Sequence, residues 1–316
     1  MIVEQLAFTE RFASSILQPP YEQGPRPRSS PGANCDELFK GGTFVFTSKR
    51  KFSAVLLSLL LALALSNPLH AQTKPKRSAL DGAPPKSILW VGNSLFFYNN
   101  GIHNYFRRMV RATVPKPKLR TNSVTISGAG LDWHDVESYF RPNGIGKYSF
   151  VAGNKIRFNK FDKLFEAVIM SDCSQCPVHP QLKSVFHETA KKDSDIVRKH
   201  GAAPMFFMTW AYKDKPEMTA QLAEAYTAAG NENDALVIPA GLAFAKAISR
   251  RPELEFYQPD KRHPTQIGTY LAAATAYGAI YQKSPVGNSY IADIDTDTAK
   301  FLQQVAWDTV REYYGK

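Results

Sequence analysis

Several features that define common protein classes are missing from this chain of 316 residues. It has three cysteines, and the pair Cys173 and Cys176 has no second Cys-x-x-Cys that would complete a four-cysteine zinc site. No thioredoxin-like Trp-Cys context precedes the pair, which argues against a thiol oxidoreductase. No internal repeat is found either, so nothing indicates a repeat architecture.

Acidic residues are in short supply, and the formal net charge is +11. Residues 1–71 carry 7 basic and 5 acidic residues, which leaves 32 and 23, a balance of +9, for the rest of the chain. This balance would suit a polyanion-binding protein. However, the basic residues occur as scattered pairs mixed with acids, and no nucleic-acid-binding motif accompanies them. We therefore expect a solvated basic surface and no nucleic-acid partner.

The apolar run at residues 52–65 is too short for a comfortable transmembrane helix, which needs about 20 residues. A basic cluster at 49–51 precedes it, and the small residue Ala71 follows it. This order is typical of a secretory signal peptide, here 48–71, that is cleaved after Ala71. An uncleaved anchor is the alternative. We expect a periplasmic or secreted protein that has no stable membrane insertion after cleavage.

The segments on either side of this signal lack the pattern of a folded domain. Residues 1–47 are rich in proline, glycine and serine, and we interpret them as a non-native or disordered extension that results from a start site assigned too far upstream. Residues 72–85 are polar and proline-rich, which predicts a flexible linker. The folded domain is expected over 86–316.

Within that domain, short apolar runs alternate with amphipathic segments. Strands are predicted at 88–91, 119–127, 167–170, 204–210 and 236–238. Helices are predicted at 101–113, 131–140, 181–200, 216–229, 241–249, 264–281 and 296–314, and a loop or hairpin at 141–162. The alternation implies right-handed crossovers. It predicts a three-layer α/β/α sandwich around a mostly parallel, five-stranded sheet.

The first predicted strand delivers a serine to one edge of this sheet. The apolar run at 88–91 ends in Gly92-Asn93-Ser94-Leu95, where glycine permits a sharp turn. Open α/β sheets bind ligands at the carboxyl ends of their strands, and several hydrolase folds present a nucleophile there. Ser94 is therefore a candidate nucleophile; the alternative is a strand that ends in a polar turn.

An acid and a histidine three positions apart precede the predicted helix at 264–281. Asp260 and His263 can point the same way from one loop, so that the histidine accepts a serine proton while the carboxylate orients its ring. The alternative is a turn aspartate beside a surface histidine, with Pro264 opening the helix.

Taken in order, Gly92-Asn93-Ser94-Leu95, Gly128 after the second strand, and Asp260 with His263 resemble the SGNH (GDSL-like) hydrolase family over about residues 86–285. The branch it resembles has Gly-Asn-Ser-Leu in place of Gly-Asp-Ser-Leu. The resemblance implies a flavodoxin-like fold and ester hydrolysis through an acyl-serine, with no metal or other cofactor. Ser94 would be the nucleophile, His263 the base and then acid, and Asp260 its orienting partner.

The resemblance also implies an oxyanion hole made by the backbone amides of Ser94 and Gly128. Gly128 could instead simply end a strand. The family's third donor, an asparagine side chain after the third strand, has no counterpart in the segment 171–177. Ser171, Ser174 or Gln175 could replace it, whereas Asp172 cannot donate while it is ionised. The sequence does not choose among them.

Three further features have open interpretations. Cys173 and Cys176 are expected to form a disulfide if the protein is exported. The alternatives are two free thiols, a redox pair, or a metal site for which His179 and His187 are the only nearby additional ligands. Trp210, at the end of the fourth strand, either forms a wall of the substrate pocket or packs in the core. Trp133 and His134 could line the same cleft.

These observations together predict an exported serine esterase. Its substrate would be a small-molecule or carbohydrate ester, for example an O-acetylated carbohydrate, by analogy with what such folds commonly do. The missing third donor leaves an alternative, a carbohydrate-binding protein that has kept the fold and lost efficient turnover.

Overall fold

The computed structural model describes residues 73–113, 115 and 117–316. The extension, the signal peptide and its cleavage site, predicted over 1–71, lie outside these residues. None of the helices in the described part combines the length and the apolar character needed to cross a bilayer.

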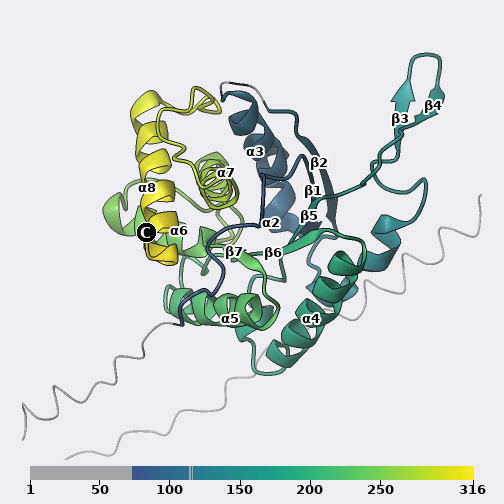
Figure 1. Cartoon of the computed structure of the whole chain (residues 1–316). Coiled ribbons are helices and arrows are strands. Elements are labelled where there is room, and N and C mark those ends of the chain that lie inside the picture. The colour runs from purple at the N-terminus through teal and green to yellow at the C-terminus, as the bar shows by residue number, and fades with distance from the viewer. Residues whose placement is uncertain (1–72, 114, 116) are drawn as a thin grey trace, which may run out of the picture. The chain divides into compact units, whose positions relative to one another are not determined.

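A parallel sheet of five strands forms the centre of the domain (Figure 1). Its strands are β1 (Ser87–Gly92), β2 (Arg120–Thr125), β5 (Ala167–Met170), β6 (Ala203–Phe207) and β7 (Leu236–Ile238). They lie in the order β2-β1-β5-β6-β7. The order reverses direction at β1 and β5, and such a switch point is where doubly wound sheets open a ligand crevice.

Alternate residues of each strand face opposite helical layers. Ile88 and Trp90 of β1 belong to one buried cluster, and Leu89 and Val91 belong to the other. Both faces of the central strands are therefore covered, and this explains why these strands read as continuous apolar runs.

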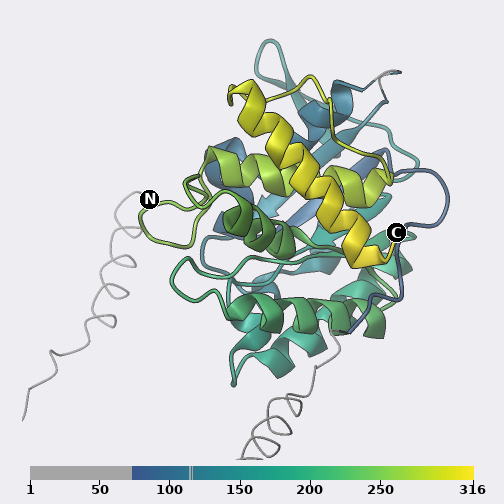
Figure 2. The ribbon, with the colours of Figure 1, turned by 90° about the vertical axis from the view of Figure 1, so that its left-hand side faces the viewer.

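The helices divide between the two faces of the sheet (Figure 1). One side carries α3 (Ile102–Arg111), α6 (Ala240–Arg250) and α7 (Gln266–Tyr281), and the other carries α4 (Lys183–Lys199) and α5 (Met218–Glu232). The last helix, α8 (Thr296–Tyr314), packs across α7, as the yellow helix of Figure 2 shows. Because it lies between the sheet and α8, α7 is buried along most of its length. The predicted three-layer sandwich is confirmed.

The segment predicted as one helix at 131–140 is instead two short 3-10 turns, η2 (Leu131–Trp133) and η3 (Val136–Phe140). His134 between them is extended, with φ −91° and ψ 127°. Its buried ring bonds through Nε2 to the carbonyl of Gly92 at 2.9 Å. A distant contact therefore interrupts a helix that the local sequence favours.

Two small elements follow, the antiparallel strands β3 (Tyr148–Val151) and β4 (Lys155–Phe158). They form the hairpin alternative predicted for 141–162. The remaining short elements are α2 (Ser94–Phe97), η1 (Tyr98–Asn100) and η4 (Cys176–Val178).

The lead-in segment, residues 73–85, is bound along the domain, which differs from the flexible linker predicted there. The backbone amide of Thr73 donates to the carboxylate of Glu224 at 3.2 Å. The Arg77 guanidinium pairs with Asp234 just beyond α5 at 2.8 Å. The polar, proline-rich composition predicted a flexible linker. Composition contains no information on the distant acidic groups that bind this segment.

Candidate active site

Ser94 lies at the turn where β1 gives way to the short helix α2. The side chain of Asn93 caps this helix by accepting the amide of Leu95 at 3.1 Å. Glycine is needed at position 92 because a β-carbon there would lie 2.9 Å from the ring of Phe96. Ser94 is 9% exposed and lies just beyond the carboxyl end of β1, beside the switch point of the sheet.

The structure brings the three residues singled out from the sequence into one hydrogen-bonded series. Oγ of Ser94 lies 2.7 Å from Nε2 of His263, and Nδ1 of His263 is hydrogen-bonded to the carboxylate of Asp260. With Nδ1 as the donor to the carboxylate, Nε2 is left as the acceptor for the serine hydroxyl. This arrangement can remove the serine proton while the carboxylate stabilises the imidazolium that forms.

A tight turn fixes the geometry of the acid and the histidine. The amide of Gln258 donates to the carbonyl of His263 at 2.8 Å, and Lys261 adopts a left-handed φ of 64° between them. Oδ1 of Asp260 accepts the amides of Arg262 and His263 at 2.9 and 3.0 Å. The Asp260 carboxylate is thus positioned by backbone amides in addition to its bond with the imidazole.

These contacts also determine the charge of Asp260. Partial desolvation opposes ionisation, but the hydrogen bonds from the His263 side chain and from the two backbone amides outweigh it and lower the pKa of Asp260 to about 2. Asp260 is therefore ionised at neutral and mildly acidic pH, as an orienting carboxylate requires.

Tyr98 and Asn99, four and five positions after the nucleophile, help to hold the histidine. The Tyr98 ring stacks on the imidazole of His263, with centroids 4.1 Å apart and planes 11° from parallel. Nδ2 of Asn99 donates to the carbonyl of Pro264 and to Oγ1 of Thr269, each at 2.8 Å. The stretch that carries Ser94 therefore also holds the loop that carries His263. The sequence analysis did not identify Tyr98 or Asn99, because their partners lie far along the chain.

We expect Tyr98→Leu to lower kcat by about three- to tenfold, because an aromatic face stabilises the imidazolium that forms when His263 takes the proton. Tyr98→Phe keeps the face and should retain most of the activity. Initial rates on an activated acetyl ester would measure both variants, with thermal unfolding as the check on folding. Equal losses in the two variants would assign the effect to the hydroxyl and would contradict this role.

Asn93 joins three strand ends at the site. Besides capping α2, it donates through Nδ2 to the carbonyl of Ala129, after β2, at 3.0 Å and to that of Asp172, after β5, at 3.1 Å. The side chain thus fixes the turn of the nucleophile relative to the loops on both sides. The sequence contained a signal for this role, an amide directly before Ser94, but its bonding partners were not predictable.

The two backbone amides predicted to form an oxyanion hole, those of Ser94 and Gly128, both lie just beyond the ends of strands. The amide of Ser94 opens α2 and so has no acceptor within that helix. Gly128 has a φ of 72°, and it lies in an exposed turn that the amide of Ala129 closes on the carbonyl of Ile126 at 3.2 Å. Among the described residues no acceptor is found for the Gly128 amide. Glycine suits this left-handed position, where other residues would be strained.

Asp172 occupies the loop where a third donor would be expected. Its Oδ1 accepts the amides of Leu131 and Cys173 at 2.8 and 2.7 Å, and the residue is 3% exposed. Desolvation raises the pKa of Asp172 to about 6, although the two amides act in the opposite direction. Of the other candidates, Ser171 is buried and its hydroxyl donates to the carbonyl of Asp172 at 3.4 Å, while Gln175 is exposed.

Because its folded pKa is raised, Asp172 binds a proton more tightly in the folded than in the unfolded chain. Stability should therefore fall as the pH rises from about 4, the unfolded value, to about 6. We expect Asp172→Asn to remove this slope and to stabilise the protein near neutral pH by up to about 3 kcal/mol. Urea unfolding at several pH values measures it. Asp162→Asn, at an exposed aspartate outside this loop, is the control, and an unchanged slope in Asp172→Asn would refute the prediction.

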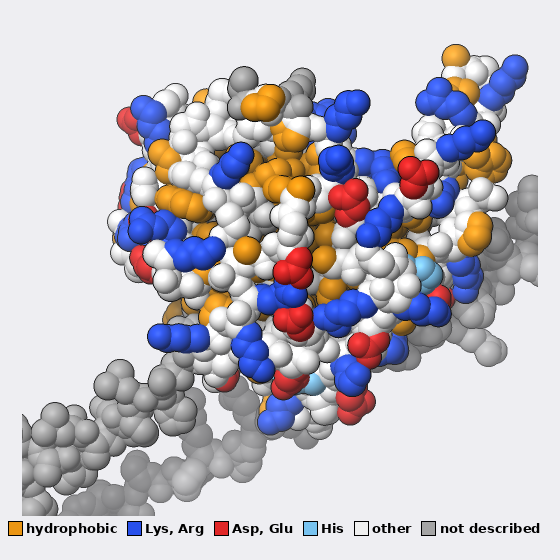
Figure 3. All heavy atoms as spheres, viewed as in Figure 1, with side chains coloured by type: hydrophobic (Ala, Val, Ile, Leu, Met, Phe, Trp, Pro, Cys, Tyr) orange, Lys and Arg blue, Asp and Glu red, His pale blue; other side chains and the backbone are white. Residues whose placement is uncertain are grey.

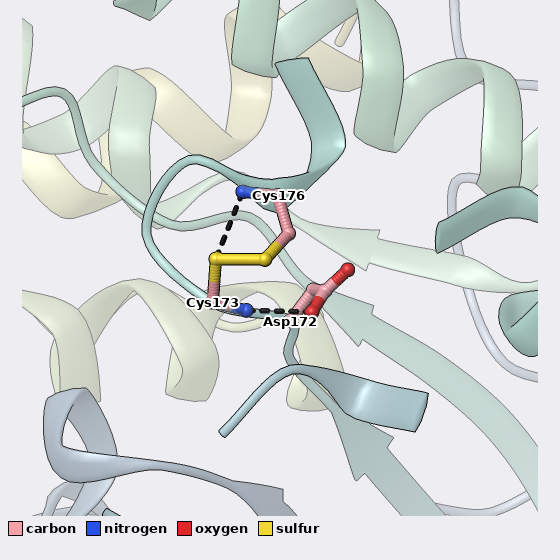
Figure 4. A group of neighbouring side chains, drawn as sticks. All are labelled: Asp172, Cys173 and Cys176. Carbon is pink, nitrogen blue, oxygen red and sulfur yellow. Dashed lines mark hydrogen bonds between the residues drawn. A yellow bond between two sulfur atoms is a disulfide. The ribbon is translucent and has the colours of Figure 1, made fainter. Parts of the chain in front are cut away.

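Cys173 and Cys176 form a disulfide across the loop after β5 (Figure 4). Their sulfur atoms and the carboxylate of Asp172 lie within 4.8 Å of one another. Bonded to each other, however, the sulfurs cannot act as thiolate ligands. His187, considered as a metal ligand from the sequence, instead pairs with Glu232 at 2.8 Å.

Trp210 does not form a wall of the site. It is 1% exposed, it stacks on Phe244 with centroids 4.1 Å apart, and its Nε1 donates to the carbonyl of Arg262 at 2.9 Å. Substrate contact by Trp210 is thus contradicted; the residue packs in the core and supports the loop of Asp260 and His263. Trp133 is exposed, whereas His134 is buried and therefore does not line a cleft.

No protein-family model and no curated protein matches this chain. A solved structure of a DUF4886 family protein from Bacteroides uniformis is 18% identical, with a TM-score of 0.53, over 70% of this chain and 93% of that one. An acetylxylan esterase from Geobacillus stearothermophilus, solved as a catalytic mutant, is 12% identical over 65% of this chain and 98% of that one, with a TM-score of 0.46. The first similarity indicates a shared fold, and the second is too distant to support a conclusion.

Proposed function

We propose that this chain is a serine esterase of the SGNH type. The observation that carries the proposal is the 2.7 Å approach of Ser94 Oγ to His263 Nε2, with Asp260 bonded to the other ring nitrogen. Structural ion pairs and hydrogen bonds are common, but a serine, a histidine and an acid in this series match the roles of nucleophile, base and orienting acid.

In the proposed reaction, Ser94 Oγ attacks the ester carbonyl while His263 Nε2 takes the hydroxyl proton. The negative charge on the carbonyl oxygen is stabilised by the amides of Ser94 and Gly128. The alcohol leaves with the proton from Nε2, and an acyl-serine remains. Water then attacks that ester and gives one proton to Nε2. The bond between the acyl carbon and Ser94 Oγ breaks, Nε2 returns the proton to Oγ, and the acid is released.

The proposed substrate is a small ester such as an O-acetylated carbohydrate, and the proposed location is the periplasm or the outside of the cell. The first part rests on analogy with esterases of similar fold. The second rests on the signal-like segment 48–71. The Cys173–Cys176 disulfide supports it, because disulfides persist in oxidising compartments.

The alternative is a carbohydrate-binding protein with little turnover. It is favoured by the loop after β5, where Asp172 lies in place of a neutral amide donor and an ionised carboxylate would repel an oxyanion. Losing one such donor typically costs about 10²–10³ in rate.

A fluorophosphonate probe separates the two proposals. The esterase should be labelled covalently at one serine and should hydrolyse an activated acetyl ester at a rate proportional to enzyme concentration. A binding protein should remain unlabelled while acetylated oligosaccharides still shift its thermal unfolding. The absence of labelling in folded protein would therefore overturn the esterase proposal.

A further inference from the structure

The β3–β4 hairpin projects from the body of the domain (Figure 1). At its base, the amide of Asn159 donates to the carbonyl of Lys147, and Nδ2 of Asn159 bonds to the carbonyl of Gly146 at 3.3 Å. It is a sheet of two strands only. Such a hairpin gains little stability by itself and usually relies on packing against another surface.

One face of the hairpin is apolar and exposed. The register pairs Tyr148 with Phe158 and Phe150 with Ile156, and these four side chains share one face because alternate residues of a strand point the same way. Phe150 is 77% exposed, Phe158 59%, Ile156 53% and Tyr148 42%. Large apolar side chains gathered in this way mark an interaction surface.

The charges around this face have one sign. Residues 141–160 contain five cations and no acidic residue, the cations being Arg141, Lys147, Lys155, Arg157 and Lys160. Arg157 and Lys155 pair with Ser149 and Val151, on the face opposite to the aromatic one. Within the described part of the chain, Arg141 has an ion-pair partner, Asp135 at 3.6 Å, and the other four have none. Figure 3 shows blue and orange side chains together on the projecting hairpin.

We infer that this hairpin docks the protein on an anionic lipid surface. Its aromatic and aliphatic side chains would enter the boundary between headgroups and acyl chains, while its cations bind lipid phosphates. This attachment is peripheral and requires no spanning segment. It also adds a surface function that the esterase proposal does not contain.

Two other occupants fit these features less well. A second copy of the hairpin would bring five cations against five with no acid to neutralise them. A soluble polyanion would neutralise the cations but would leave the Phe150 and Phe158 rings in water. An anionic bilayer supplies both the negative charge and an apolar phase.

The test uses the full chain and a probe that reports only on the hairpin. In a Cys35→Ser background the remaining cysteines form the disulfide, so Phe150→Cys offers one free thiol for an environment-sensitive fluorophore. Val286→Cys, at an exposed apolar position in the loop before α8, is the matched control. Both labelled proteins are mixed with vesicles of phosphatidylcholine containing phosphatidylglycerol, with or without brominated acyl chains.

We expect the fluorophore at position 150 to shift to the blue and to be quenched by the brominated lipid, and the fluorophore at 286 to remain unchanged. Lys155→Glu with Arg157→Glu should weaken the vesicle response at 150 by about tenfold or more. Thermal unfolding confirms that the variants are folded. No response at 150, an equal response to phosphatidylcholine alone, or the same blue shift with soluble dextran sulfate would each overturn the inference.

Discussion

Ser94→Ala is expected to abolish fluorophosphonate labelling and to lower kcat by about 10³-fold or more. The substitution removes the only atom that can form the acyl bond, while the backbone amides of Ser94 and Gly128 remain. Binding of the ester should therefore persist, so that KM changes little compared with kcat. Active-site titration and steady-state rates on an activated acetyl ester measure the effect.

Ser249→Ala provides the matched control, because Ser249 is an exposed serine on α6. It should label and turn over like the parent protein. If Ser94→Ala were still labelled at the parental rate, another residue would be the nucleophile and the esterase mechanism proposed above would be wrong, even though the fold would be unaffected.

Asp260→Asn should lower kcat by about 10³–10⁴-fold, more than the loss of one hydrogen bond would suggest. Oδ1 of Asp260 accepts two backbone amides, so the carbonyl oxygen of an asparagine must take that position. Its NH₂ group would then face Nδ1 of His263, which would have to become an acceptor. The ring proton moves to Nε2, and Nε2 can no longer accept the proton of Ser94.

Asp214→Asn tests whether a change of charge near the loop is enough by itself to lower kcat. Asp214 pairs with Lys261 of the same turn at 3.3 Å but does not contact His263. Its substitution should leave kcat within about twofold, because exposed ion pairs contribute little. Similar losses in both variants would indicate a general electrostatic effect and would refute the tautomer argument.

The fold was predictable for segments whose burial leaves a clear apolar pattern in the sequence. The predicted strands at 167–170 and 236–238 and the helix at 296–314 have the observed bounds. Fully buried strands and a long amphipathic helix carry their signal in apolar periodicity alone. Periodicity contains no information on the order of the strands, because that order depends on which neighbours pair; only the flavodoxin-like fold implied by the resemblance bears on it.

For the candidate site, the sequence identified the side chains that would react, while their support came only from the structure. Ser94, Asp260 and His263 were named from residue type and spacing, and the structure places them within hydrogen-bonding distance of one another. Their catalytic roles remain predictions. The bonds of Asn93 to two neighbouring loops and the stacking of Tyr98 join positions far apart in the chain, so no local pattern contains them.

For Trp210, the interpretation as a wall of the substrate pocket was wrong. The strand predicted over 204–210 ends at Phe207 in the structure, so Trp210 lies three residues beyond β6. A tryptophan just after a strand can face either the substrate site or the core, and apolar periodicity does not determine which. Phe244, on a helix more than thirty positions later, decides the matter by stacking on the indole.

The anchoring of the lead-in segment has a practical consequence for where the mature protein should begin. Its first described contact, from Thr73 to Glu224, starts two positions beyond the proposed cut after Ala71. Processing at that point would preserve every tether that the segment makes to α5 and its surroundings. A recombinant protein that begins at residue 86 would lack Arg77, so the carboxylate of Asp234 would lose this ion-pair partner.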